Sequence, residues 1–355
     1  MIHDDVRICP PLPTARTARS SDQTASHLRE HRHPVATTRT VPPFCSDRVD
    51  SAFVGCGGQI WVICAATFRQ LVVVPGVRCC VERSWGLLAA GRGPGWWGMP
   101  EYVLDHHQEG ERERLALMSR LLDPMHRGQI ERLGVGSGAR TLEVGCGNGS
   151  VSAWLAERIA PGGQAVAVDL DLSLAIADVS GLELRQADIL AGPVEPGDFD
   201  LVTARAVLHH VADAEAAVVN LVASARPGAA VLLIEPDFLP ATVAEPPEVR
   251  AFWKGWLAWS RGQGIDYFIG RRLPAMLSRL GLQDVEATAQ TAHYNGGSGW
   301  AVYWRQTVIE LRARLVASGK LDDRLIDAFL ARCADPAWWT QTIAFTAAAG
   351  RVRGE

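Results

Sequence analysis

The sequence predicts an α/β fold built on a doubly wound, mostly parallel sheet. Three observations support this prediction. From Thr141 onward, short apolar segments alternate with segments of helical periodicity. A glycine-rich turn follows the first apolar segment, and acidic residues stand at the ends of the next two. Strands that alternate with helices pair in parallel and are covered on both faces.

The elements follow one another in a regular order. The first helix begins near Glu111 and places Leu115, Met118, Leu121 and Leu122 on one face. Strands are predicted over residues 141–144, 164–168, 183–186, 200–204 and 230–234, and further helices over residues 151–159 and 214–225. The tripeptide Arg226-Pro227-Gly228 is predicted to form the turn before the fifth strand.

The C-terminal part is expected to close the sheet and to cover it. Residues 285–290 and 342–350 are predicted to pair antiparallel and complete a seven-stranded, Rossmann-like sheet. Between and before them lie two helical cap insertions, at about residues 238–280 and 299–335. In the first, Phe252, Trp253, Trp256 and Trp259 recur at helical spacing. Such an aromatic stripe more often belongs to a core than to a ligand site.

The chain changes character near Met99. Residues up to Thr40 are rich in Arg, His, Pro, Ser and Thr, which predicts disorder. An apolar run over 52–74 is interrupted by three glycines, so a membrane anchor is the weaker alternative for it. Residues 91–98 resemble a linker. We therefore expect a poorly ordered extension over 1–98, with a regulatory or targeting segment as the alternative, and a folded domain over 99–355.

Composition narrows the functional classes. The 355 residues include 48% apolar and 21% charged residues, with a net charge of −4 and a pI of about 6.2. This balance argues against a general nucleic-acid-binding surface. The eight cysteines show no C-x-x-C spacing, which favours a reduced, cytoplasmic protein without a zinc site. No metal ligand set, membrane partner or nucleic-acid partner is expected, and the oligomeric state is left open.

The segment LEVGCGNGS, residues 142–150, is the strongest functional signal. A short strand with one acidic residue, Glu143, leads into a turn that contains Gly145, Cys146, Gly147 and Gly149. Glycines let the backbone turn at little steric cost and approach a ligand closely. The following helix directs its N-terminal N–H groups at the turn, where negative charge is favoured.

Two acids follow in order at later strand ends. Asp169 comes 20 residues after Gly149 (169 − 149), where a carboxylate can accept hydrogen bonds from two ribose hydroxyls. Asp188 ends the third strand and can accept from an exocyclic adenine amine. The neighbours of these acids, with the end of the fourth strand, complete the predicted cofactor site: Leu170, Ala187, Ile189 and Arg205.

With these motifs the chain resembles the class I S-adenosylmethionine-dependent methyltransferases. The resemblance covers about residues 102–351 and includes VAVDLD, QADIL, FDLVTARAVLHHV and RPGAAVLLIEPDF. It is closest to bacterial methyltransferases of secondary and lipid metabolism that open with a Tyr-x-Leu segment and an E-x-x-R-L helix. It implies that S-adenosylmethionine is the cofactor and that Tyr102 and Arg114 close over its methionine end. Together with the cofactor motifs, the aromatic insertion predicts a small, fairly apolar methyl acceptor.

Two other functions stay open at this point. A dehydrogenase would need G-x-G-x-x-G, whereas this turn reads G-x-G-x-G, and Asp188 would have no role. A sensor or scaffold could bind the nucleotide without turnover. For methyl transfer, His209 and His210 follow the fourth strand and are the candidate catalytic residues. Glu235 and Asp237, after the fifth strand, are candidates for orienting a substrate.

Overall fold

The computed structural model describes residues 52–56, 59–63 and 110–354. It divides into two units, residues 1–90 and 91–355. In the first, β1 (Ala52–Cys56) and β2 (Gln59–Ile63) pair antiparallel. This hairpin occupies part of the apolar run, for which the sequence predicts no strands.

The predictions of disorder up to Thr40, of a linker over 91–98 and of a role for Tyr102 all fall outside the described residues. The alternative of a membrane anchor over 52–74 lies mostly outside them too. Among the helices that the structure describes, none combines the length and the apolar character needed to cross a membrane.

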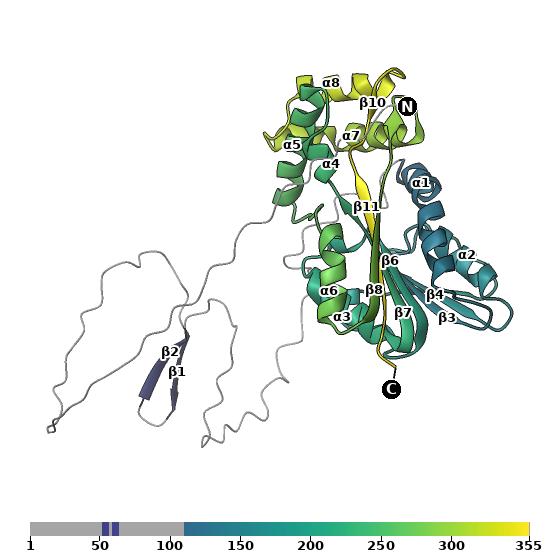
Figure 1. Ribbon diagram of the computed structural model, residues 1–355. Helices are drawn as coiled ribbons and strands as arrows, with labels where there is room; N and C mark the ends of the chain where they lie inside the picture. The colour runs from purple at the N-terminus through teal and green to yellow at the C-terminus, as the bar shows by residue number, and fades with distance from the viewer. Residues whose placement is uncertain (1–51, 57–58, 64–109, 355) are drawn as a thin grey trace, which may run out of the picture. The chain divides into compact units, whose positions relative to one another are not determined.

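The second unit is built on the predicted seven-stranded sheet (Figure 1). Its strand order is β5-β4-β3-β6-β7-β11-β8. The strands are β3 (Arg140–Val144), β4 (Gln164–Asp169), β5 (Leu182–Gln186), β6 (Phe199–Arg205), β7 (Ala225–Asp237), β8 (Gln283–Thr291) and β11 (Ala344–Arg351). Strands β3 to β7 pair in parallel, and β11 runs antiparallel to both β7 and β8. The doubly wound fold and the closing antiparallel pair are thereby confirmed.

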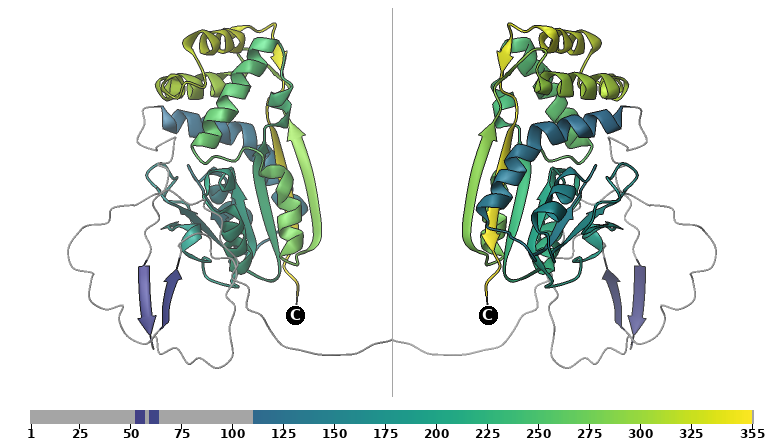
Figure 2. Two further views of the ribbon diagram at one scale, coloured as in Figure 1. Left: turned by 90° about the vertical axis from the view of Figure 1, so that its left-hand side faces the viewer. Right: turned by 90° about the vertical axis from the view of Figure 1, so that its right-hand side faces the viewer.

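Helices cover both faces of this sheet, which is why its central strands are almost continuously apolar and buried. One face is covered by α1 (Glu111–Arg132) and α2 (Ser150–Arg158). The other is covered by α3 (Ala214–Ser224) and α6 (Leu273–Arg279). Figure 2 shows both layers from the two sides. The outer strands β5 and β8 have only one neighbour and are more exposed.

The predicted turn at Arg226-Pro227-Gly228 is wrong. Strand β7 already begins at Ala225 and runs through these residues. Its register against β6 shifts between Phe199 and Leu201, so the exposed residues form an irregularity within the strand. Gly228 has φ +81° and its N–H donates to the carbonyl of Val352 at 2.9 Å. This partner lies 124 residues away (352 − 228), so local turn signals could not reveal it.

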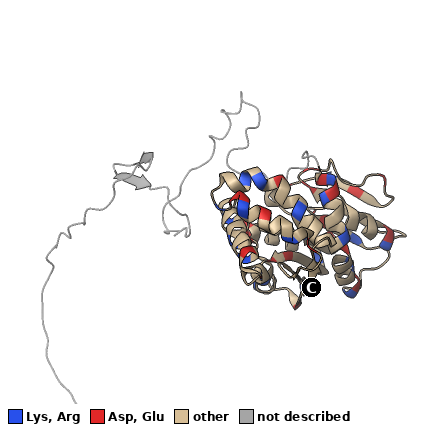
Figure 3. Ribbon diagram, turned by 90° about the horizontal axis from the view of Figure 1, so that it is seen from above, with Lys and Arg blue, Asp and Glu red and all other residues tan. Residues whose placement is uncertain are grey.

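A helical cap stands over the carboxyl end of the sheet (Figures 1 and 2). It contains α4 (Leu239–Thr242), α5 (Pro247–Gly262), α7 (Gly299–Ala317) and α8 (Asp323–Ala334), with the short pair β9 (Tyr294–Asn295) and β10 (Trp339–Thr340). The aromatic stripe of α5 is its core: Phe252 stacks on Phe329 with ring centroids 3.9 Å apart. Trp253 meets Trp304 edge-on at 4.8 Å. Basic and acidic residues are interspersed along the outer helices (Figure 3).

Candidate functional site

The glycine turn lies between β3 and α2. Gly145, Gly147 and Gly149 have φ values of +70°, +54° and +73°, a region that disfavours residues with a Cβ. A Cβ on Gly145 would also collide with Cγ2 of Val207. One on Gly147 would come no nearer to another atom than 3.8 Å, to Leu115 Cδ2. The turn is therefore packed closely on one side, while Gly147 borders open space that a ligand could use.

Asp169 joins the end of β4 to this turn. Its Oδ2 accepts a hydrogen bond from the N–H of Gly147 at 2.8 Å, and its Oδ1 accepts from the N–H of Leu170 at 2.7 Å. The backbone carbonyl of Asp169 accepts from Ala187 N–H at 3.0 Å, which brings in the end of β5. Leu170 is 56% exposed, an apolar side chain left open beside the turn. The structure thus brings these predicted residues together.

Asp188 and Ile189 make contacts within the protein that the sequence does not predict. The side chain of Asp188 accepts from the N–H of Leu190 at 2.8 Å and caps a short 3₁₀ helix, Ile189–Ala191. Ile189 is buried among the residues that pack against α3. Asp188 can still accept further bonds through its other oxygen, because a carboxylate has about four acceptor sites.

Glu143 lies buried beneath the turn, where it accepts a short hydrogen bond from Ser152 Oγ. Burial raises the pKa of Glu143 to about 7. Burial also raises the pKa of the Cys146 thiol above its ordinary value, which leaves this cysteine unreactive. The predicted cofactor residue Arg205 ion-pairs with Asp123 of α1 at 2.9 Å.

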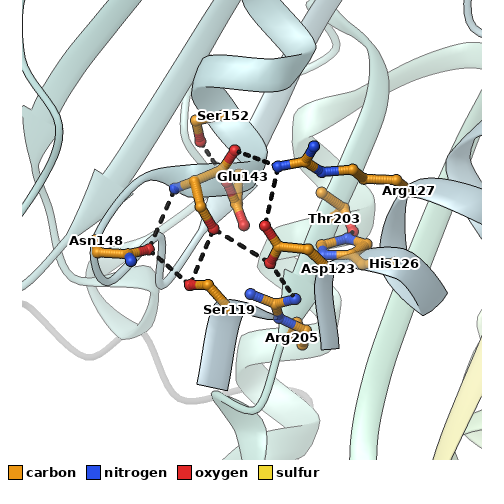
Figure 4. Close-up of polar contacts among 10 residues, drawn as sticks. Ser119, Asp123, His126, Arg127, Glu143, Asn148, Ser152, Thr203 and Arg205 are labelled. Carbon is orange, nitrogen blue, oxygen red and sulfur yellow. Dashed lines mark hydrogen bonds and ion pairs between the residues drawn. The ribbon is translucent and has the colours of Figure 1, made fainter. Parts of the chain in front are cut away.

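Polar side chains of α1 contact the glycine turn and the start of α2 (Figure 4). The sequence did not predict this cluster. Besides Arg205, Asp123 receives a hydrogen bond from Ser150 Oγ at 3.2 Å. One turn earlier, Ser119 Oγ donates to Asn148 Oδ1 at 3.0 Å. The available signal was the i, i+4 spacing of Ser119 and Asp123 on one helix face. That spacing alone is equally typical of a solvated face.

A pocket opens where β6 and β7 end under the cap, with about 530 Å³ of space between atoms, part of it open to solvent. The predicted residues Arg114, His209 and His210 all line it. Aromatic side chains form most of the remaining wall: Phe238, Tyr267, Trp300, Tyr303, Trp304 and Phe345. Ala206 lines the pocket and Val207 touches the glycine turn, so the two sites adjoin.

His209 is held by Glu235, at the end of β7. The ring Nδ1 lies 2.7 Å from Glu235 Oε2. The same carboxyl accepts backbone N–H bonds from Val207, Leu208 and His209, at 2.8, 2.7 and 3.3 Å. Burial raises the pKa of Glu235 to about 8 and lowers the pKa of His209 to about 3. Both shifts favour the uncharged forms of the two groups over an ion pair.

The second candidate orienting residue, Asp237, is engaged elsewhere. Its carboxylate forms a two-pronged ion pair with Arg271, at 2.6 and 2.7 Å. It also accepts from the N–H of Leu239 at 2.9 Å. These contacts hold the start of the cap, and Asp237 is not among the residues that line the pocket. Glu235 and Asp237 therefore differ in function although they are two residues apart.

Arg114 lies in the pocket wall and is paired with Glu111. Its Nε and NH2 atoms each approach a Glu111 oxygen at 2.6 Å, and NH1 donates to Tyr303 Oη at 3.3 Å. Both charged residues are almost fully buried, with 2% and 0% of their surface exposed. Sequence reasoning singled out Arg114 but missed Glu111, which resembles an ordinary first-turn acid of a helix.

Comparison with known protein families supports a methyltransferase site at the glycine turn and the adjoining pocket. Residues 112–287 match the family described as a methyltransferase domain. This part of the chain belongs to the S-adenosylmethionine-dependent methyltransferases. The matched range contains the glycine turn, Asp169, Asp188 and both pocket histidines, so the family resemblance rests on the residues that the fold assembles.

Among similar proteins is a ubiquinone biosynthesis O-methyltransferase of Bordetella parapertussis, 40% identical over 116 residues, which are 30% of this chain and 47% of that protein. A protein of the same name from Xanthomonas euvesicatoria is 35% identical, over 41% of this chain and 64% of its own. A putative methyltransferase structure from Bacillus halodurans aligns with a TM-score of 0.45 and 16% identity, over 63% and 96%. The chain thus spans about half the length of the first of these relatives.

The described residues contain no group of three or more His, Cys, Asp or Glu side chains arranged to hold a metal ion. The two cysteines of the described second unit, Cys146 and Cys333, are buried and free.

Proposed function

We propose that this protein transfers a methyl group from S-adenosylmethionine to a small, largely apolar acceptor. One observation supports this most strongly: the glycine turn and the aromatic pocket adjoin at the carboxyl edge of the sheet, through Ala206 and Val207. Group transfer needs donor and acceptor held side by side with water excluded. We propose residues 99–355 as the catalytic domain, with α5, α7 and α8 as the cap over the acceptor.

The residues around the turn fit this cofactor. Oδ2 of Asp169 accepts one backbone hydrogen bond and Oδ1 accepts two, from Leu170 and Asp171. Because a carboxylate has about four acceptor sites, Asp169 keeps acceptor capacity for a ribose hydroxyl. The open space at Gly147 and the buried acid Glu143 suit the methionine end. The adenine would lie among Leu170, Ala187, Asp188 and Ile189, while Arg114, Arg205 and Tyr102 would act nearer the acceptor and the methionine. When bound, S-adenosylmethionine supplies a methyl group already activated on a sulfonium.

We further propose an oxygen atom as the acceptor, which is supported by the names of the two bacterial relatives, both O-methyltransferases. A hydroxyl must lose its proton during transfer, so a base is useful. His209 lies in the pocket wall, and the ring nitrogen opposite Nδ1, Nε2, is turned away from Glu235. His209 would take the hydroxyl proton, and Glu235 would hold the ring and stabilise the imidazolium. His210 would pack beside it, since its ring centroid is 3.9 Å away.

Asp169→Ala is expected to weaken S-adenosylmethionine binding by about 100-fold, since charge-assisted hydrogen bonds contribute about 1.5–3 kcal/mol each. Calorimetric titration of the full chain measures this loss. Asp169→Asn should keep much of the turn's geometry and lose less affinity. Glu157→Gln, which removes an exposed acid of α2, serves as the control. Unchanged binding by Asp169→Ala would contradict the cofactor assignment.

Activity should rise with pH through about 8, the pKa that burial gives Glu235. Below this pH the protonated carboxyl donates to His209 Nδ1, which leaves the ring proton on Nε2 and no lone pair for the acceptor. Above it the carboxylate accepts from Nδ1–H, and Nε2 becomes free to take a proton. A profile of kcat/KM over pH 6–9.5 with a hydroxyl acceptor tests this. Glu235→Gln should abolish the inflection, and a variant with an unchanged inflection would contradict the assignment.

The partner is proposed to be a small molecule. Location in the cytoplasm stays a prediction from the cysteine pattern, which fractionation of cells that express the full chain would test.

A further inference from the structure

Two stripes of side chains on α1 contact the two adjoining sites. Met118 and Leu122, four residues apart, line the acceptor pocket. Ser119 and Asp123, each one residue further along the chain, contact the glycine turn and the start of α2. Residues four apart lie above one another on the same face of a helix, so the two stripes run side by side along one segment of α1. Movement of this segment would therefore change both sites together.

Asp123 makes charge-assisted contacts with two other elements of the fold (Figure 4). Its Oδ1 accepts from Arg205 NH1 at 2.9 Å and from Ser150 Oγ at 3.2 Å, and its Oδ2 accepts from Arg127 at 3.0 Å. Arg205 ends β6, directly before Ala206 of the pocket wall, and Ser150 begins α2. Only 7% of the surface of Asp123 is exposed. In such surroundings these hydrogen bonds are stronger than in water.

The next residue, Pro124, weakens the helix at this point. Proline has no N–H, so residue 124 cannot make the helical hydrogen bond to the carbonyl of Arg120, and its ring crowds that carbonyl. Beyond the proline, α1 is anchored to β6, because His126 Nε2 lies 2.8 Å from Thr203 Oγ1 and both residues are buried. Before it, residues 111–122 carry the pocket stripe. The interruption makes opening of this first half easier than opening of the whole helix.

We infer that Asp123 is a positioning residue, through which a bound cofactor stabilises residues 111–122 and with them the pocket wall. S-adenosylmethionine bound against the glycine turn would order residues 148–150, so that releasing Asp123 from this segment would cost more free energy. Local opening and ligand binding are then coupled, and the coupling acts equally in both directions. The inference rests on the proposed function, because it takes the glycine turn as the cofactor site.

Hydrogen exchange of the full chain, measured with and without saturating S-adenosylhomocysteine, tests this coupling. In the wild-type protein the ligand should slow exchange over residues 111–122 at least about tenfold, which lies within the usual range of coupling between sites. Asp123→Asn keeps the size of the side chain and removes its charge. In this variant the ligand should slow exchange over residues 111–122 less than about twofold, while the glycine turn should stay protected.

A purely structural role of Asp123 would give a different result. Asp123→Asn would then speed up exchange equally with and without ligand, and the ratio of the two rates would stay as in the wild type. The matched control is Glu131→Gln, which removes an exposed acid from the second half of α1 and should keep the wild-type ratio. Thermal melting shows whether each variant is folded.

Two milder variants keep the test informative if Asp123→Asn does not fold. Ser119→Ala removes neutral contacts with Asn148 and Ser150, and should lower the ratio about threefold, as expected for a neutral hydrogen bond. Pro124→Ala allows the helical hydrogen bond to the carbonyl of Arg120. Residues 111–122 should then exchange at least about tenfold more slowly without ligand, and the ligand should add little further protection.

Three results would overturn the inference. The first is that S-adenosylhomocysteine binds to the wild-type protein without slowing exchange over residues 111–122. The second is that Asp123→Asn, or Ser119→Ala in its place, keeps the wild-type ratio. The third is that folded Asp123→Asn loses S-adenosylhomocysteine binding, which would make Asp123 a direct ligand of the cofactor. Failure of the proposed function is distinct, since it would appear as no binding of S-adenosylmethionine to the wild-type protein in calorimetry, and it would remove this inference as well.

Discussion

His209→Asn is expected to lower kcat for a hydroxyl acceptor by about 10²- to 10⁴-fold, the usual contribution of a general base. The side chain lies in the pocket wall and its Nδ1 is fixed 2.7 Å from Glu235. Asparagine can keep a hydrogen bond to Glu235 but cannot accept the acceptor's proton. Initial rates with saturating S-adenosylmethionine and catechol measure the effect. The affinity for S-adenosylmethionine, followed by calorimetry, should change little.

Two further histidine variants make the result specific. His210→Asn should reduce kcat much less than His209→Asn, because Glu235 contacts the ring of His209. His293→Asn changes an exposed histidine that is not among the pocket-lining residues, and it should leave the rate unchanged. If His209→Asn retains most of the wild-type kcat, or if His210→Asn shows the larger loss, then His209 is not the base.

Gly145→Ala is expected to lower the free energy of unfolding by about 2–4 kcal/mol and to reduce cofactor affinity at least about 100-fold. The position requires φ +70°, which costs a residue with a Cβ about 1–3 kcal/mol. The added Cβ also collides with Val207 Cγ2, and overpacking of this kind costs about 1–3 kcal/mol more. Any relief must displace the segment that joins the glycine turn to the pocket.

Gly147→Ala separates the effect of backbone strain from the effect of the collision with Val207. Its φ of +54° is also positive, but an added Cβ has no neighbour closer than 3.8 Å. We expect a loss of only about 1 kcal/mol in urea unfolding, from backbone strain alone. Its cofactor affinity should nevertheless fall, because the new methyl group enters the space proposed for the ligand. Equal stability losses in the two variants would show that contact with Val207 is unimportant.

The fold was largely predictable because its signals are local. Segments such as residues 165–168 and 201–204 are buried on both faces, and this burial requires a largely apolar sequence. The glycines of the turn and Asp169 were also found, since a positive φ and an acid at a strand end follow fixed spacing. The prediction of a turn at residues 226–228 was wrong for the opposite reason. These residues belong to β7, and the hydrogen-bond partner of Gly228, Val352, lies near the C-terminus.

The site was predictable only in part. Glu111, Ser119 and Asp123 belong to a helix whose polar residues resemble a solvated face until the helix is packed against the sheet. Their burial depends on what α7 and the glycine turn bring to that face. Likewise, His209 and His210 are adjacent in sequence and equally plausible as bases. The structure places Glu235, 26 residues after His209 (235 − 209), against the ring of His209.

The sequence by itself determined the doubly wound sheet, the place of the glycine turn and the order of the acids that follow it. These features depend on periodicity and on residues whose conformational preferences are intrinsic. The tertiary structure alone decided which charges are buried together, that Glu235 contacts the ring of His209, and which aromatic rings line the pocket. Those properties arise from contacts between distant segments, such as α1 with α7 and β6 with β7, and burial then changes the pKa values of the groups enclosed.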